Sequence, residues 1–137
     1  MVITVDYDGR HAWRGAKTYY SNRPYGSIDV SYAGSGAVNL WALLDTGADY
    51  LCLDDAVAKS IGINLRASTN YVAVTTPLGA TASLPLWTVR MTIEGRSADV
   101  DAIFDSSFAT TPLLGRAALL DAIKFGIDVT GWLYADP

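Results

Sequence analysis

Apolar and polar residues alternate along much of the chain, and this pattern predicts a succession of short β-strands. The alternation is clearest at 27–32, Ser-Ile-Asp-Val-Ser-Tyr, where every second side chain is apolar or aromatic. A period of two is typical of a strand with one buried face and one solvent face. Stretches rich in β-branched and apolar residues predict further strands at 2–7, 37–44, 70–76, 81–93, 98–104 and 127–134.

Turn-forming residues separate the predicted strands. Gly-Ser-Gly at 34–36 is expected to reverse the chain between two strands, and Glu-Gly-Arg at 94–96 is expected to do the same. Pro-Leu-Gly-Ala at 77–80 predicts the tip of another hairpin. Pro85 lies in the returning strand of that hairpin. It indicates an edge position or a bulge, because proline cannot donate a ladder hydrogen bond.

Two short helices are predicted between the strands. The first covers 55–61, with Asp54 as its N-cap and Gly62 just beyond its C-terminal end. The second covers 116–123 and follows a tight Leu-Leu-Gly turn. Many short strands with two short helices predict a mainly β domain.

Composition narrows the classes of protein that fit this pattern. The chain has 137 residues, half of them apolar, which suits a single domain with its own core. Its formal net charge of -4 argues against nucleic-acid binding, which needs a clustered basic face. Four basic residues cluster near the N-terminus: Arg10, Arg14, Lys17 and Arg23. We interpret this cluster as a solvated loop, with an anion-binding surface as the alternative.

The scarcity of cysteine and histidine excludes several kinds of active site. Cys52 and His11 are the only residues of their types, so they cannot build a structural zinc site with four nitrogen or sulfur ligands. The sequence contains no Gly-x-Ser-x-Gly motif, which would indicate a serine hydrolase. Cys52 lies between leucines and is expected to be a buried, inert thiol. Carboxylates are the main remaining candidates for acid–base chemistry, and we expect no metal and no organic cofactor.

The four tryptophans are scattered along the chain. Trp41 and Trp87 fall within predicted strands. We therefore expect the tryptophans to pack in the core or at an interface, and not to form a stacking surface for sugars or bases.

One aspartate stands at a position that the strand pattern singles out. Residues 42–48, Ala-Leu-Leu-Asp-Thr-Gly-Ala, place Asp45 on a tight turn at the end of an apolar strand. A second turn, Leu-Leu-Gly-Arg at 113–116, follows later in the chain. Together the two motifs resemble the active-site signature of the retropepsins, the retroviral-type aspartic proteases. Because the motif occurs once, the resemblance implies a homodimer in which each chain supplies Asp45.

The resemblance also implies a fold and roles for individual residues. It implies a single-lobed, closed β fold of the acid-protease kind, with two short helices and a flap hairpin. Asp45 would be catalytic, and the position of Thr46 binds its counterpart across the dimer axis in the family. The implied active-site loop and substrate-binding residues are Thr46, Gly47, Ala48 and Asp49. Gly115 and Arg116 would support them, with an ion pair between Asp49 and Arg116.

The expected flap departs from the viral pattern. The candidate hairpin covers 71–86, and its tip would be Thr76, Pro77, Leu78 and Gly79. Viral flap tips are rich in glycine, whereas Pro77 has no N–H to offer a substrate. Leu78 or Gly79 would then donate, and an ordinary exposed hairpin is the alternative. Tyr50 is a further departure, because the viral enzymes often carry another acid there.

The resemblance divides the chain into an N-terminal extension, 1–24, and a protease domain, 25–137. The extension is expected to be a processed leader or an extra strand of the core. The start of the chain has no secretory signal, and no apolar run reaches the ~18 residues of a membrane span. We expect a soluble protein without direct membrane contact, cytoplasmic if the chain is intact.

These features predict an aspartic endopeptidase, a hydrolase that acts on extended polypeptide as a homodimer and binds no nucleic acid. A catalytically weak peptide-binding or dimerisation module of the same fold is the alternative. A monomeric structural domain is a third class.

Overall fold

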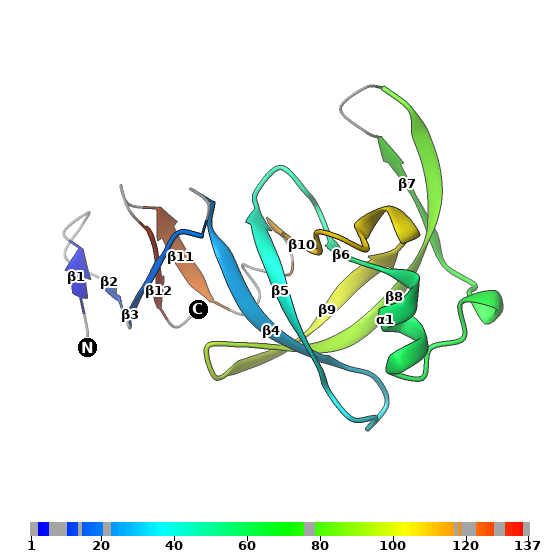
Figure 1. Ribbon diagram of the computed structural model, residues 1–137, viewed down its shortest axis with the longest axis horizontal. Helices are drawn as coiled ribbons and strands as arrows, with labels where there is room; N and C mark the ends of the chain where they lie inside the picture. Colours follow the sequence, from blue (N-terminus) through cyan, green and yellow to red (C-terminus); the bar gives the residue numbers. More distant parts are fainter. Residues whose placement is uncertain are drawn as a thin grey trace.

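The computed structural model describes residues 3–5, 11–13, 15–20, 23–75, 79–116, 118, 123–127 and 131–135. In chain order its strands are β1 (Ile3–Val5), β2 (His11–Trp13), β3 (Gly15–Thr18), β4 (Tyr25–Ser31), β5 (Val38–Asp45), β6 (Leu51–Leu53), β7 (Tyr71–Thr75), β8 (Thr81–Ile93), β9 (Arg96–Phe104), β10 (Leu113–Gly115), β11 (Lys124–Ile127) and β12 (Gly131–Ala135). Figure 1 shows their arrangement.

Six of these strands close into a barrel. Their order is β4-β5-β10-β6-β9-β8, and β8 pairs back with β4 to complete the ring. The ring contains both antiparallel pairs, such as β8 with β9, and parallel pairs, such as β5 with β10. The prediction of a mainly β, closed, single-lobed fold is confirmed.

The core of the barrel follows from the alternation in the sequence. On β4, Gly26, Ile28 and Val30 are buried, while Ser27 and Asp29 between them are exposed. The same alternation on the other barrel strands turns one apolar face inward, because successive side chains of a strand point to opposite faces. The largest fully buried side chains include Ile28, Leu51, Met91, Ile93, Phe104 and Leu114.

The β7–β8 hairpin projects beyond the barrel (Figure 1). Its register pairs Tyr71 with Pro85 and Thr75 with Thr81, as the predicted hairpin requires. Pro85 occupies an edge position: Leu86 donates its N–H to Asn70 on one side (2.9 Å). The nitrogen of Pro85 therefore faces the other side, where pairing with β9 begins only at Leu86.

The first predicted helix is present as α1 (Asp55–Ser60), and two short 3-10 helices follow elsewhere, η1 (Leu65–Ala67) and η2 (Ser106–Phe108). Gly62 follows the helix with a φ of 86°, as expected for a residue just past the C-terminal end. Asp54 is the N-cap residue, as predicted, but its side chain makes no capping hydrogen bond. Its backbone carbonyl accepts the N–H of Val57 (3.0 Å), and the carboxylate takes no part. The second predicted helix lies largely outside the described residues, although Arg116 and Ala118 have helical backbone.

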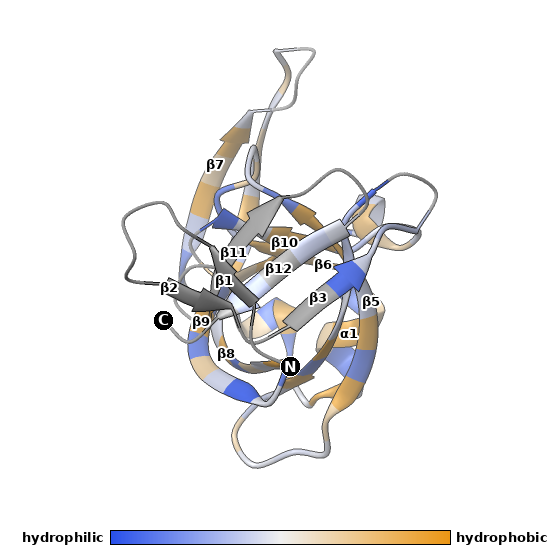
Figure 2. Ribbon diagram, turned by 90° about the vertical axis from the view of Figure 1, so that its left-hand side faces the viewer, coloured by the Kyte–Doolittle hydropathy of each residue, from blue (hydrophilic) through white to orange (hydrophobic). Residues whose placement is uncertain are grey.

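The C-terminal part of the chain forms a sheet of its own with an N-terminal strand. The prediction of one strand over 127–134 is wrong, because β11 and β12 are two antiparallel strands, and β12 pairs on its other edge with β3. This sheet lies at one end of the barrel, next to β4 (Figures 1 and 2). Residues 15–18, within the predicted N-terminal extension, are thus hydrogen-bonded to the C-terminal strand.

Trp132 joins this terminal sheet to the barrel. Its side chain is fully buried, and its indole N–H donates to the carbonyl of Tyr25 on β4 (3.0 Å). On β3, the Lys17 ammonium pairs with Glu94 in the turn between β8 and β9 (3.1 Å). Both contacts bind the terminal sheet to the barrel within one chain. Among the described residues, no helix combines the length and the apolar character that crossing a membrane requires.

Candidate active site

Asp45 is the last residue of β5, where the strand leaves the barrel. Ala42 and Leu44 on this strand point into the core and are buried, so Leu43 and Asp45 point outward, and both are half-buried. The carboxylate is thus carried by a strand fixed in the core, while its side chain faces away from the core.

The loop that follows, residues 45–49, is called the Asp45 loop. One carboxylate oxygen of Asp45, Oδ1, accepts the backbone N–H of Gly47 (2.9 Å). The carbonyl of Asp45 accepts the N–H of Ala48 (3.1 Å), which closes the tight turn expected from the sequence. Thr46 and Gly47 are exposed at the tip of this turn. The loop therefore orients its own carboxylate through the main chain.

The second motif lies directly beside the first. In the parallel pair of β10 with β5, Leu114 stands opposite Leu44 and Gly115 opposite Asp45. Leu114 is fully buried and also pairs with Leu51 on β6. The resemblance implied that Gly115 supports the active-site loop, and the strand pairing places Gly115 beside Asp45.

Gly115 approaches the backbone of the Asp45 region more closely than any side chain would allow. A Cβ at this position would lie 2.1 Å from the carbonyl oxygen of Tyr50. The next residue, Arg116, donates its backbone N–H to the carbonyl of Ala48 (2.8 Å). The turn after β10 and the Asp45 loop are therefore in direct main-chain contact, which requires glycine at 115.

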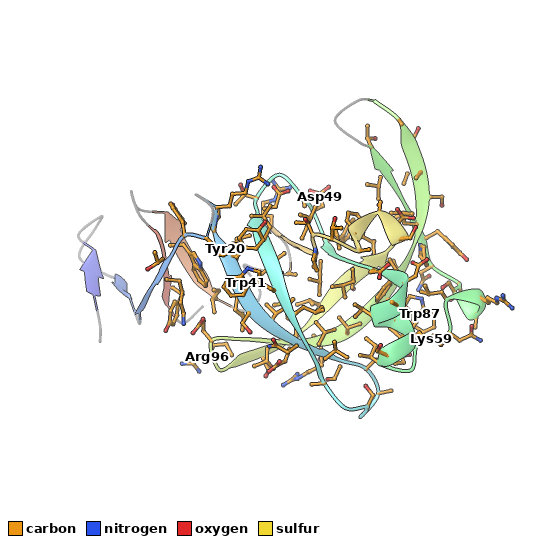
Figure 3. All side chains as sticks on the ribbon, in the orientation of Figure 1. Tyr20, Trp41, Asp49, Lys59, Trp87 and Arg96 are labelled. Carbon is orange, nitrogen blue, oxygen red and sulfur yellow. The ribbon has the colours of Figure 1, made fainter. Side chains whose placement is uncertain are left out.

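The expected ion pair between Asp49 and Arg116 is present. The guanidinium nitrogen and the carboxylate oxygen are 2.8 Å apart, and both side chains are more than half exposed. Figure 3 places Asp49 at the upper side of the barrel, the side toward which the β7–β8 hairpin also extends. Because exposed pairs contribute only ~0.2–1 kcal/mol, this pair orients the two turns more than it stabilises the fold.

Cys52 lies underneath the Asp45 loop on β6. Burial, and to a lesser degree the negative charges of Asp45 and Asp49, raise the pKa of its thiol to about 12. The thiol contacts the carbonyl oxygen of Tyr50 (3.4 Å). The prediction of a buried thiol is confirmed, and at neutral pH it holds its proton and is a poor nucleophile.

The structure describes only part of the expected flap tip. Gly79 is exposed and has a φ of 85°, whereas Thr76, Pro77 and Leu78 lie outside the described residues. The two arms of the hairpin are present as β7 and β8. The choice between Leu78 and Gly79 as donor therefore stays a prediction.

Main-chain contacts on both sides of β5 were not predicted from the sequence. Leu43 donates its N–H to the carbonyl of Pro112 (2.9 Å), and Leu44 donates to the carbonyl of Pro24 (2.8 Å). These bonds fix the strand that carries Asp45 between two segments distant in sequence. Every residue has a backbone carbonyl, so the sequence held no signal that would identify these acceptors.

The chain matches a known family over the part that holds this site. A comparison with curated proteins finds no match. The family described as gag-polyprotein putative aspartyl protease matches residues 33–121, more than half of the chain. This span contains the Asp45 loop, the β7–β8 hairpin and the turn at Gly115 and Arg116. The chain therefore belongs to the family described as gag-polyprotein putative aspartyl protease.

Proposed function

We propose that this protein is an aspartic endopeptidase that works as a symmetric homodimer. The observation that carries the proposal is the outward-facing carboxylate of Asp45, held at the end of a core strand by its own loop, in a chain with a single Asp-Thr-Gly sequence. Peptide hydrolysis of this type needs two facing carboxyls. A two-fold axis near Asp45 supplies both from one motif, because an isologous interface presents the same surface twice.

The two carboxyls share one proton in the proposed mechanism. Two like charges ~3 Å apart cannot both ionise easily, so one group stays protonated while the other is a carboxylate. Aspartic proteases are an established example of two carboxyl groups that share one proton. The carboxylate takes a proton from a water, which attacks the amide carbon. The carboxylic acid donates to the carbonyl oxygen, and a proton then passes to the leaving nitrogen.

The surrounding residues position this pair. The N–H of Gly47 binds Oδ1 of Asp45 and fixes the direction of the carboxylate. Leu114 and Gly115 pack beneath the loop, and Arg116 holds it through the carbonyl of Ala48 and the carboxylate of Asp49. Asp45 is the catalytic residue in this proposal, and the others are positioning residues.

The substrate is an extended polypeptide. An extended chain can add to exposed backbone as a further strand, with alternate side chains in pockets. The β7–β8 hairpin would cover the bound chain and exclude water from the reacting bond.

The experiment that tests the proposal is digestion of an unfolded mixed-peptide library between pH 3 and 7, with and without a statine inhibitor. Wild type is compared with Asp45→Asn, which keeps the side-chain shape but cannot act as acid or base. Asp101→Asn is the matched control, because Asp101 is an exposed aspartate on β9 bonded to Thr88 (3.0 Å). Sedimentation at several concentrations measures the oligomeric state of all three proteins.

The proposal expects statine-sensitive cleavage by wild type and by Asp101→Asn, and its loss in Asp45→Asn with dimerisation unchanged. Cleavage by Asp45→Asn at the wild-type rate would refute the mechanism. A folded wild-type dimer that binds peptides without cutting them would instead favour the peptide-binding module of the same fold.

A further inference from the structure

Three aromatic side chains form an exposed cluster on the outer face of β4 and β5. The rings of Tyr25 and Trp41 are stacked, with centroids 5.8 Å apart and planes 5° from parallel. Tyr20 stands edge-on to both rings, at 5.9 Å and 6.3 Å. Figure 3 shows Tyr20 and Trp41 side by side at β5. We call Tyr20, Tyr25 and Trp41 the aromatic platform.

The platform leaves an unusual amount of apolar surface in water. Tyr20 is 62% exposed and Trp41 is 51% exposed. Within the part of the chain that the structure describes, three large apolar side chains are exposed to this degree, and two of them meet here. Scattered exposed aromatics need no explanation, but a stacked set with open faces is typical of a binding surface. Trp41 is therefore not a core residue, and of the two places expected for it, core or interface, only the interface stays a prediction.

The platform is continuous with the strand that carries Asp45. Side chains alternate along β5, so Trp41, Leu43 and Asp45 share the outward face, while Ala42 and Leu44 are buried. Across the β4–β5 pair, Tyr25 stands directly opposite Leu43. The outward face thus runs without a break from the carboxylate, past Leu43 and Tyr25, to Trp41. At ~3.3 Å per residue, Trp41 is about 13 Å from Asp45 along the strand.

We propose that the aromatic platform binds an aromatic side chain of the polypeptide substrate, about four residues from the bond that is cut. This inference rests on the proposed endopeptidase function and names a substrate preference of the same site. A substrate that runs extended along the outward face of β5 covers 13 Å with about four residues. A ring at that position meets the open faces of Tyr20 and Trp41.

Buried apolar area favours an aromatic guest over a cationic one. A lysine or arginine of the substrate could use the ring faces through a cation–π contact. A phenyl or indole ring covers the same faces with more apolar surface and stacks against them. A peptide that carries lysine at the same position distinguishes the two guests.

The test uses matched peptides built on a sequence that wild type cleaves. The probes carry Phe, Leu or Lys at one position, moved from two to six residues away from the cut on either side. The value of kcat/KM is measured for wild type, Trp41→Ala and Trp41→Phe. Arg90→Ala is the control, because Arg90 is an exposed residue on β8 with a partner of its own, Asp99. Binding of the same peptides to Asp45→Asn is measured by calorimetry, so that the platform is also tested without cleavage.

The proposal expects wild type to prefer Phe over Leu about tenfold at a position near four residues from the cut. Trp41→Ala should lose this preference, while Trp41→Phe and Arg90→Ala should keep most of it. The inference is overturned if no position prefers Phe, if Lys is preferred, or if the preference survives in Trp41→Ala. If wild type cuts no peptide, the endopeptidase proposal fails, and the Phe-to-Leu ratio in binding of matched peptides from the uncut library to Asp45→Asn decides for or against the platform.

Discussion

The Asp45 loop and the β7–β8 hairpin differ in what holds their backbones in place. Beneath the loop lie buried side chains of three strands, including Leu44, Leu51 and Leu114, and the carbonyls of Tyr50 and Ala48 touch the Gly115 turn. The two described arms of the hairpin, 71–75 and 81–86, have no such support. No residue of β7 is buried, and the first seven residues of β8 are exposed or half-buried.

Within one proposed site, the Asp45 loop is held in a precise position, whereas the β7–β8 hairpin can adapt its conformation. A carboxylate that must meet its counterpart within a hydrogen bond's length needs a scaffold with close packing on every side. A segment that covers substrates of varying sequence needs an inexpensive rearrangement, which few buried contacts allow. Both regions then serve one reaction, and substitutions should affect them very differently.

The largest expected effect is that of adding a methyl group at Gly115. Gly115→Ala places a Cβ 2.1 Å from the carbonyl oxygen of Tyr50, a distance that the backbone must relieve by moving. We expect a loss of about 4 kcal/mol or more in the free energy of unfolding, measured by urea denaturation. Gly36→Ala is the control, since nothing lies within 4 Å of its Cβ. Equal stability of the two variants would show that the Asp45 region is less constrained than it looks.

The next effect compares one apolar residue from each region. Leu114→Ala empties a fully buried position beneath the Asp45 loop and should cost about 2–5 kcal/mol. Val74→Ala removes a half-buried side chain from β7 and should cost less than about 1 kcal/mol. Thermal and urea unfolding of both variants measure the difference. Similar losses would remove the contrast between loop and hairpin.

The smallest expected effect is that of the exposed ion pair on the loop. Arg116→Ala removes the partner of Asp49 and should lower stability by only ~0.2–1 kcal/mol, less at high salt. Arg90→Ala, which breaks the exposed pair with Asp99, should cost a similar amount. If the proposal is right, however, Arg116→Ala lowers kcat more than Arg90→Ala does, because only Arg116 positions the Asp45 loop. The same kcat for both variants would assign Arg116 a surface role.

The parts of the molecule that the sequence predicted are those with a local signal. The strand over 27–32 follows from its alternation, and the turn at 94–96 from its glycine, so β4 and the β8–β9 turn lie where they were expected. The place of Asp45 at a strand end followed from the apolar strand and the tight turn after it, whereas the ion pair between Asp49 and Arg116 was expected only from the resemblance to the retropepsins. A motif reports local geometry that its own residues impose.

The failures come from contacts that are distant in sequence. β3 is polar and short, and it becomes a strand because it pairs with β12 more than a hundred residues later. The predicted strand over 127–134 contains most of β12 and only the last residue of β11, Ile127, so β11 was not recognised as a strand of its own. In the structure a Cβ on Gly131 would meet the carbonyl oxygen of Lys17 at 2.0 Å, so this glycine admits the close approach of β3. The aromatic platform was missed for the same reason: Trp41 reaches Tyr25 only when β4 pairs with β5.

The rate at which Cys52 is alkylated can report how often the region beneath the Asp45 loop opens. With a pKa of about 12, its thiol is only ~0.1% ionised at pH 9, so alkylation of the closed protein is slow. When β6 separates from its neighbours the thiol meets water, its pKa falls, and it is labelled. The chain holds a single cysteine, so the mass added per unit time counts the openings of this one place. A ligand that holds the loop shut would lower the alkylation rate of Cys52 in the unmutated protein, without any dye or engineered tag.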